Sequence, residues 1–186
     1  ALRLGQILNL TLEVDIPQFA NLSVTTARKL KKFLLVIAES APFKPNFVSL
    51  AGKLEVSRNS VEEYLTLMED AGLISRLRDQ AKGIISLGKV EKVFLDNTNL
   101  IYYLSGREPE IGNVRETFFL NQMRVNHAVA SSAVADFKID KYTFEVGGKS
   151  KSQEQIKNKA NAFIVRDNIE YGHKNVLPLW VFGLNY

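Results

Sequence analysis

The feature that most constrains the fold is the stretch EVSRNSVEEYLTLMEDAGLISRL, residues 55–77. Ser57 is placed to cap a helix, because its hydroxyl can accept a hydrogen bond from a backbone N–H of the first turn. Gly72 supplies the left-handed residue that ends such a helix, and Leu73-Ile74 begins an extended run. Between them the apolar residues recur at three- and four-residue steps, and they are Val61, Tyr64, Leu65, Leu67, Met68 and Ala71. This spacing predicts a capped amphipathic helix that leads directly into a strand.

The segments around this helix predict a winged helix-turn-helix. Phe47 to Leu54 fits a shorter helix, and a turn through Glu55-Val56 separates it from the longer one. Helix, turn, helix and strand follow one another in the order of that motif. After a polar turn at 78–83, strand-like runs at 84–87 and 93–95 complete the wing, and a short helix at 100–104 follows.

The residues before this motif predict a helical linker. Ser23 caps a helix from Val24 to Glu39, whose apolar stripe faces away from a basic side. The first 12 residues predict another apolar helix, which Asp15-Ile16-Pro17 should stop. An apolar helix at the very start favours a piece cut from a longer protein.

Length and composition limit the class of protein. The chain has 186 residues, a net charge of +4 and no cysteine. The length allows one large domain or two small ones, and the lack of cysteine excludes disulfides and cysteine-bound zinc. Every apolar run is shorter than the roughly 20 residues that span a bilayer. We therefore expect a cytoplasmic protein without a membrane partner.

The second half changes to an α/β rhythm after the polar segment 105–109, which is the best candidate boundary. We expect domains at 1–105 and 106–186, and an α+β protein overall. The predicted elements of the second domain are a helix near 113–126, strands near 128–134, 136–139 and 142–146, a polar helix near 151–160, a strand at 162–165 and an aromatic strand at 176–182. This order predicts a mixed sheet flanked by helices.

Duplex DNA binding by the helix-turn-helix depends on Arg58 and Asn59, which lie on its outward face. The helix has one cation against four anions between Ser57 and Ala71, a net charge of −3. Such a charge opposes a polyanion, so a protein-docking or spacer role is favoured over base reading.

A second candidate site lies in ADFKIDKYTFEVGGKSK. Metal-dependent phosphodiester cleavage needs two carboxylates that hold Mg²⁺ and a lysine near the attacking water. Asp136 and Glu145 come from successive strands, and Lys149 shares the face of Glu145 if the strand continues. Glu116 on the preceding helix could complete the cluster. The alternative is that these are unrelated surface charges.

The same region holds a basic run from Lys141 to Ala160. Lys151 and Lys157 within it are candidate nucleic-acid contacts, and a solvated helix is the alternative. Gly147-Gly148-Lys149-Ser150 looks like the end of a P-loop, but Thr143 stands where that pattern needs glycine. His127 and His173 have no metal-ligand spacing around them.

The sequence resembles a group of bacterial and archaeal AAA-type ATPases. In that group a P-loop domain precedes a winged helix and a C-terminal domain similar to the PD-(D/E)xK restriction-endonuclease fold. The segments that carry the resemblance are SRNSVEEYLTLMEDAGLI, KVFLDNTNLIYYL, IGNVRETFFLNQMR, ADFKIDKYTFEVGGKSK and LPLWVFGLNY.

The resemblance implies an upstream ATP-binding domain as a partner and assigns roles to single residues. Glu116 matches the glutamate of the core helix, and Asp136 and Glu145 match the metal-binding pair. The nuclease lysine should stand two residues after Glu145, where this chain has Gly147, so Lys149 is its proposed substitute.

Three hypotheses follow. The first is a non-catalytic module that docks a protein or nucleic acid under control of the ATPase. The second is a Mg²⁺-dependent DNA nuclease that uses Asp136, Glu145 and Lys149. The third and weakest is a regulator that binds DNA through Arg58 and Asn59.

Overall fold

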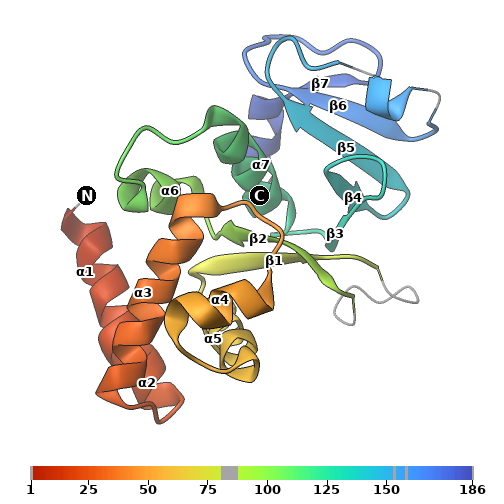
Figure 1. The fold of residues 1–186 in the computed structure, drawn as a ribbon. Coiled ribbons are helices and arrows are strands. Elements are labelled where there is room, and N and C mark those ends of the chain that lie inside the picture. The colour runs from red at the N-terminus through yellow and green to blue at the C-terminus, as the bar shows by residue number, and fades with distance from the viewer. Residues whose placement is uncertain (1, 81–87, 153, 158, 186) are drawn as a thin grey trace. The chain divides into compact units, whose positions relative to one another are not determined.

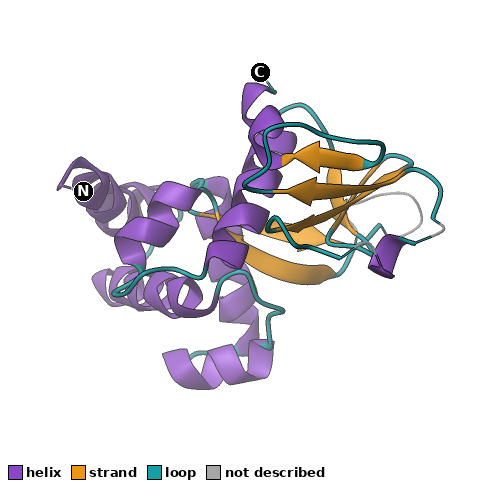
Figure 2. Ribbon diagram, turned by 90° about the horizontal axis from the view of Figure 1, so that it is seen from above, coloured by secondary structure: helices purple, strands orange, loops and turns teal. Residues whose placement is uncertain are grey.

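The computed structural model describes residues 2–80, 88–152, 154–157 and 159–185 (Figure 1). The chain is an α+β protein with a two-stranded sheet and a five-stranded mixed sheet (Figure 2). It divides into two compact units, the first with residues 1–76 and 93–109, and the second with residues 77–92 and 110–186. The predicted boundary after residue 105 lies close to one junction, but sequence reasoning did not anticipate that 77–92 groups with the second unit.

The first unit is mainly helical. Its helices are α1 (Leu2–Leu10), α2 (Ile16–Phe19), α3 (Val24–Ser40), α4 (Phe47–Leu54), α5 (Arg58–Asp70) and α6 (Thr98–Leu104). The Ser57 side chain accepts a hydrogen bond from the Ser60 N–H, and Ser23 does the same for Thr26. Gly72 has a φ of 68°, the left-handed conformation that ends α5. The predicted caps and helix end are confirmed.

The two-stranded sheet pairs β1 (Ile74–Arg78) with β2 (Val90–Leu95). Helix α4, helix α5 and these strands follow one another in the predicted order of a winged helix-turn-helix. Val61, Leu65 and Met68 of the predicted stripe are fully buried in the first unit. The predicted strand at 84–87 lies outside the described residues.

The prediction that Pro17 stops the first helix is wrong. Thr11–Asp15 forms a π-helical turn between α1 and α2, so the chain stays helical to Phe19. Pro17 has no N–H to donate, but the Ile16 N–H directly before it still bonds the Thr11 carbonyl, so the helix continues past the ring. The wider turn ahead of it accommodates the ring.

The second unit is built on the five-stranded sheet, in the order β3-β4-β5-β6-β7. Its elements are α7 (Ile111–Met123), β3 (Val129–Ser131), β4 (Phe137–Ile139), β5 (Tyr142–Gly147), β6 (Ala162–Arg166) and β7 (Val176–Pro178). Strands β3 to β5 pair antiparallel, whereas β6 pairs parallel to both β5 and β7. The mixed sheet predicted for this half is therefore present.

Helix α7 packs on one face of this sheet through aromatic rings. The buried Phe119 ring lies about 5 Å from the rings of Phe137 (5.0 Å), Phe144 (5.3 Å) and Phe182 (4.9 Å). These contacts fix α7 against the strands that carry the candidate carboxylates.

Two elements of the second unit differ from prediction. Among the described residues of 151–160, where a polar helix was expected, the helical part is a short 3₁₀ turn, Glu154–Ile156. The aromatic strand expected at 176–182 ends at Pro178, and Leu179–Leu184 form a second 3₁₀ turn. Pro178 has no N–H for a sheet ladder, which explains this second difference. No helix among the described residues is both long and apolar enough to cross a membrane.

Candidate functional site

The register of β4 and β5 brings the two candidate metal-binding carboxylates together. Phe137 pairs with Phe144 in this antiparallel ladder, so Asp136, one residue earlier, falls opposite Glu145, one residue later. Side chains directly opposite one another share a face of the sheet and lie close together. The Asp136 Oδ2 atom accepts a hydrogen bond from the Val146 N–H at 2.9 Å, which locks this end of the two strands.

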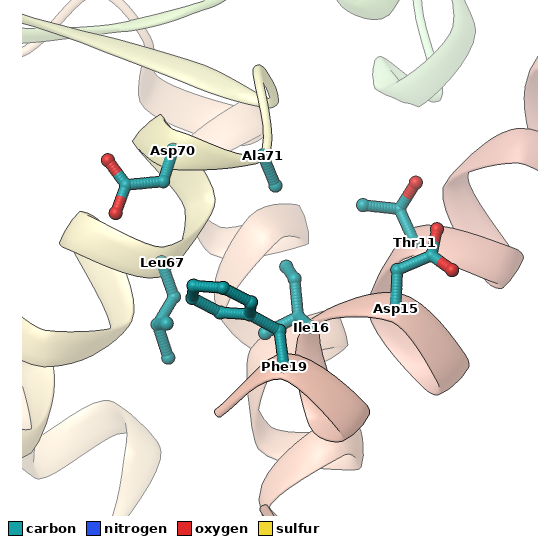
Figure 3. Close-up of a pocket in the computed structure, with 7 residues that line it drawn as sticks. All are labelled: Thr11, Asp15, Ile16, Phe19, Leu67, Asp70 and Ala71. Atoms are coloured by element: carbon teal, nitrogen blue, oxygen red, sulfur yellow. The ribbon is translucent and has the colours of Figure 1, made fainter. Parts of the chain in front are cut away.

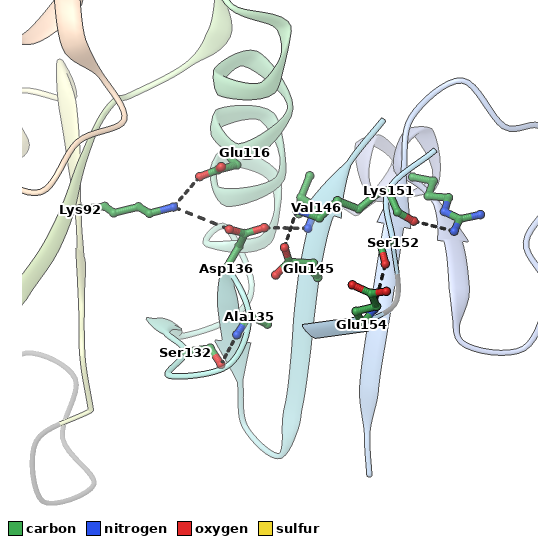
Figure 4. A network of polar contacts seen from close by, with 11 residues as sticks. Lys92, Glu116, Ser132, Ala135, Asp136, Glu145, Val146, Lys151, Ser152 and Glu154 are labelled. Carbon is green, nitrogen blue, oxygen red and sulfur yellow. Dashed lines mark hydrogen bonds and ion pairs between the residues drawn. The ribbon is translucent and has the colours of Figure 1, made fainter. Parts of the chain in front are cut away.

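Glu145 is a buried acid with a lysine partner. Its side chain is 3% exposed, and its Oε1 atom lies 2.5 Å from the Nζ atom of Lys151 (Figure 4). A charged group so far from water is costly unless it is paired and hydrogen-bonded. The Lys151 ammonium therefore compensates for the buried charge of Glu145.

The lysine beside Glu145 is Lys151, and the prediction that Lys149 takes this place is wrong. Strand β5 ends at Gly147, and the Lys151 N–H donates to the Gly148 carbonyl at 3.0 Å, which closes a turn. Lys149 lies in this turn and is exposed. The face alternation that would have brought Lys149 beside Glu145 stops where the strand stops.

Gly147 is the reason that Lys151 reaches Glu145. A Cβ atom built on Gly147 would lie 2.6–2.8 Å from the Cδ, Cγ and Cβ atoms of Lys151. The lysine stem therefore fills the space that a side chain at position 147 would occupy. Position 147 is also where the resemblance places the nuclease lysine, so a lysine from further along the chain occupies that volume.

Two arginines hold the turn that carries Lys151. Arg166 donates from Nη2 to the Lys151 carbonyl at 2.6 Å. Arg115 on α7 pairs through Nε with Asp167 at 2.9 Å, and its guanidinium lies close to Gly148. Charge-assisted bonds of this kind are strong, so the turn is anchored on both sides.

Asp136 lies between two ion pairs (Figure 4). On one side is the Glu145–Lys151 pair. On the other side, the Lys92 Nζ atom lies 2.9 Å from Glu116 Oε2 and 3.7 Å from Asp136 Oδ1. These five residues, Lys92, Glu116, Asp136, Glu145 and Lys151, are called the carboxylate–lysine cluster below.

The cluster shifts the pKa values of its carboxyl groups. Burial raises the pKa of Glu145, and the hydrogen bond from Lys151 only partly opposes this. Burial and the charge of Asp136 likewise raise the pKa of Glu116, against the hydrogen bond from Lys92. Both glutamates are thus harder to ionise than free glutamate, as expected of acids in a partly dry site.

The pKa values of the two lysines in the cluster are raised, which favours their charged forms. Burial alone would lower the pKa of Lys151, but the hydrogen bond and charge of Glu145 outweigh it and raise the pKa. The pKa of Lys92 is raised in the same way, with Glu116 in the place of Glu145. Both ammonium groups therefore stay charged at neutral pH.

The carboxylate oxygens of the cluster suit a Mg²⁺ ion that is bound by few protein ligands. Carboxylate oxygens of Asp136 and Glu145 are the ligands that Mg²⁺ prefers. Among the described residues, no group of three or more Asp, Glu, His or Cys side chains has the geometry of a metal cage. Mg²⁺ is commonly held by one or two carboxylates together with water and substrate phosphates, and the cluster fits that mode.

The remaining candidate contacts lie elsewhere. Arg58 and Asn59 are exposed in the first turn of α5, where the Arg58 guanidinium lies 5.8 Å from the centre of the Phe47 ring. Lys157 is exposed after the second unit's first 3₁₀ turn. Only Lys151 of the four candidate nucleic-acid contacts belongs to the carboxylate–lysine cluster.

The first unit contains a cavity of about 320 Å³ (Figure 3). It is lined by Thr11, Asp15, Ile16, Phe19, Leu67, Asp70 and Ala71. Phe19 is 85% exposed. The cavity lining has two carboxylates and no cation, and the carboxylate–lysine cluster belongs to the second unit.

Sequence reasoning missed Lys92 and the role of Lys151 at this site. Gly147 was the signal for Lys151, because a glycine at that position leaves room for a side chain from the following turn. Lys92 gives no comparable signal. It lies in a strand remote in sequence, and only the folded chain brings it to Glu116.

A family profile described as Domain of unknown function (DUF8612) matches residues 1–111, more than half of the chain. The chain belongs to this family. The DUF8612 match contains Lys92, whereas the other four cluster residues lie beyond its end. No curated protein and no solved structure is significantly similar to the chain.

Proposed function

We propose that the second unit carries a Mg²⁺-dependent centre that cleaves phosphodiester bonds, built on Asp136, Glu145 and Lys151. The observation that supports this most is the Lys151 side chain, which lies in the space above Gly147 and pairs with the buried Glu145. Two carboxylates on adjacent strands and one lysine at the same strand end are the groups that this chemistry needs.

Each residue has a distinct task in this proposal. Asp136 and Glu145 would hold Mg²⁺, which when bound polarises the phosphate and activates water. Lys151 orients the attacking water with its ammonium protons and offsets the negative charge that develops on the phosphate. Arg166 and Arg115 keep the turn, and with it the ammonium of Lys151, in place.

The decisive test is cleavage of plasmid and linear DNA by the purified chain with Mg²⁺. Activity should fall at least about 100-fold in Glu145→Gln, Asp136→Asn and Lys151→Met. Lys149→Met is the matched control and should keep the activity, because Lys149 is exposed in the same turn. DNA left intact by the natural sequence over a range of Mg²⁺ concentrations would contradict the proposal.

We also propose that the chain works within an AAA-type ATPase and that its first unit docks the P-loop domain. The resemblance to that group supports this, as do exposed apolar side chains such as Phe19 and Val48, which are 85% and 74% exposed. ATP turnover by the longer protein should change when residues 107–186 are removed. Unchanged turnover would count against control of this half by the ATPase.

A further inference from the structure

Lys92 places a positive charge beside two of the three carboxylates of the carboxylate–lysine cluster. Its ammonium lies 2.9 Å from Glu116 and 3.7 Å from Asp136, on the side of Asp136 away from the Glu145–Lys151 pair. Lys92 comes from β2, whereas Glu116 comes from α7 and Asp136 from the residue directly before β4. Three separate elements thus converge on one ammonium group.

A two-metal centre needs ions about 3.5–4 Å apart, so both would lie beside neighbouring carboxylates. In the carboxylate–lysine cluster, Asp136 is the carboxylate with neighbours on both sides, so it would be available to either position. Glu145 would complete the ligands of one ion, and Glu116 would be the ligand left for the other. The Lys92 ammonium contacts both Glu116 and Asp136 and so lies between the two donors of that second position, whereas Lys151 at the first position pairs with Glu145 alone.

We infer that Lys92 acts as a tethered cation that restricts the centre to a single divalent ion. The inference rests on the proposed function, since it concerns the same site. It assigns Lys92 as a residue that sets the number of metal ions, and not as a group that touches the reacting phosphate. A fixed ammonium supplies charge without the open coordination positions that a metal would offer to water or substrate.

The experiment counts bound Mn²⁺ per chain, by calorimetry and by the electron paramagnetic resonance of free Mn²⁺. The natural sequence should bind one ion. Lys92→Met removes the charge while it keeps most of the side-chain length, and this variant should bind two. In Lys92→Met combined with Glu116→Gln, the count should return to one, because the second position has lost its own carboxylate.

Two further variants separate charge from fold. Lys92→Arg keeps the positive charge and should bind one ion. Lys89→Met removes an exposed lysine three residues away on the same segment and should also bind one. If Lys92→Met alone fails to fold, circular dichroism will show it, and Lys92→Gln, which is uncharged and polar, then carries the test.

The possible outcomes are distinct. One ion in both the natural sequence and a folded Lys92→Met variant would overturn the inference but leave the proposed function standing. Two ions in the natural sequence would overturn it as well. If neither protein binds Mn²⁺, both the inference and the proposed function fail.

Discussion

Glu145 shows at the scale of one residue how the candidate site differs from an ordinary surface charge. Its carboxyl group is 3% exposed in the middle strand of a five-stranded sheet, a position where an apolar side chain would be expected. Buried acids of this kind lower stability unless their partners are well placed. The cost of keeping Glu145 is consistent with a functional role.

We predict that Glu145→Gln changes the pH dependence of stability in a defined direction. Burial raises the pKa of Glu145 above its unfolded value of 4.5, so the folded chain holds this proton more tightly than the unfolded chain. The contribution to stability is therefore present at low pH and is lost as the pH rises through the folded pKa. Glutamine does not titrate. The free energy of unfolding of Glu145→Gln, relative to the natural sequence, should thus increase as the pH rises above 4.5 and through the folded pKa.

Urea unfolding at several pH values measures this difference. The sign of the slope is the test, because the absolute offset also includes the loss of the Lys151 partner. Two parallel pH profiles would show that burial does not control the ionisation of Glu145.

At the scale of elements, the end of β5 decides which lysine reaches the site. The two strand carboxylates were predictable from the sequence, because they follow from the period of two along strands β4 and β5. The choice of Lys149 failed because the strand ends at Gly147 and the next four residues form a turn. The turn after the strand is held by contacts of Arg115 and Arg166, which come from distant parts of the chain.

We predict that Gly147→Ala weakens cleavage, since its Cβ would approach the Lys151 stem to within 2.6–2.8 Å. The lysine would have to leave its position beside Glu145. The exchange Gly147→Lys with Lys151→Gly should restore part of the activity that Lys151→Gly alone loses, because residues 145 and 147 share a face of the strand. Cleavage rates of the three variants, with Mn²⁺ binding as a check on the site, measure this. No recovery in a variant that still binds metal would contradict the role given to this space.

Helix α5 supports a prediction about DNA. Its net charge from Ser57 to Ala71 is −3, and Arg58 already lies near the Phe47 ring. We expect that Arg58→Ala changes the affinity of the chain for duplex DNA by less than about threefold at low salt, since one exposed contact with phosphate contributes little beside four opposing carboxylates. Fluorescence anisotropy with a labelled duplex measures this. A large, salt-dependent loss in Arg58→Ala would instead favour the regulator hypothesis.

The helices themselves were largely predictable, because caps and apolar stripes are local signals. Ser23, Ser57 and Gly72 mark helix ends that the structure confirms. The prediction that Pro17 ends the first helix failed because a π-helical turn ahead of it accommodates the ring. The segment 151–160 lacks an apolar stripe that would hold a helix against the sheet, and of its described residues only Ile156 is buried.

At the scale of the whole molecule, the chain passes between its two units three times, after residues 76, 92 and 109. The segment 77–92 therefore belongs to the second unit although most of its sequence neighbours belong to the first. Sequence composition indicated only the last of these junctions, because the other two fall inside strands β1 and β2. A change in composition can indicate a linker, but it does not indicate a junction that falls inside a strand.

We predict that limited trypsin digestion cuts early after Arg107, which is exposed between α6 and α7. The fragments should stay together after this cut, because residues 77–92 remain on the N-terminal piece but pack within the second unit. Mass spectrometry locates the cut, and size-exclusion chromatography under native conditions reports whether the pieces separate. Separation after a single cut at Arg107 would show that 77–92 contributes little to the second unit.

Because Gly147 has no side chain, it affects how sequences with this pattern would be classified. A pattern search that demands a lysine at a fixed interval after the second acid would score this chain as a pseudoenzyme. Sequences with glycine at that interval are better judged by whether a turn follows that can return a lysine to the vacant volume.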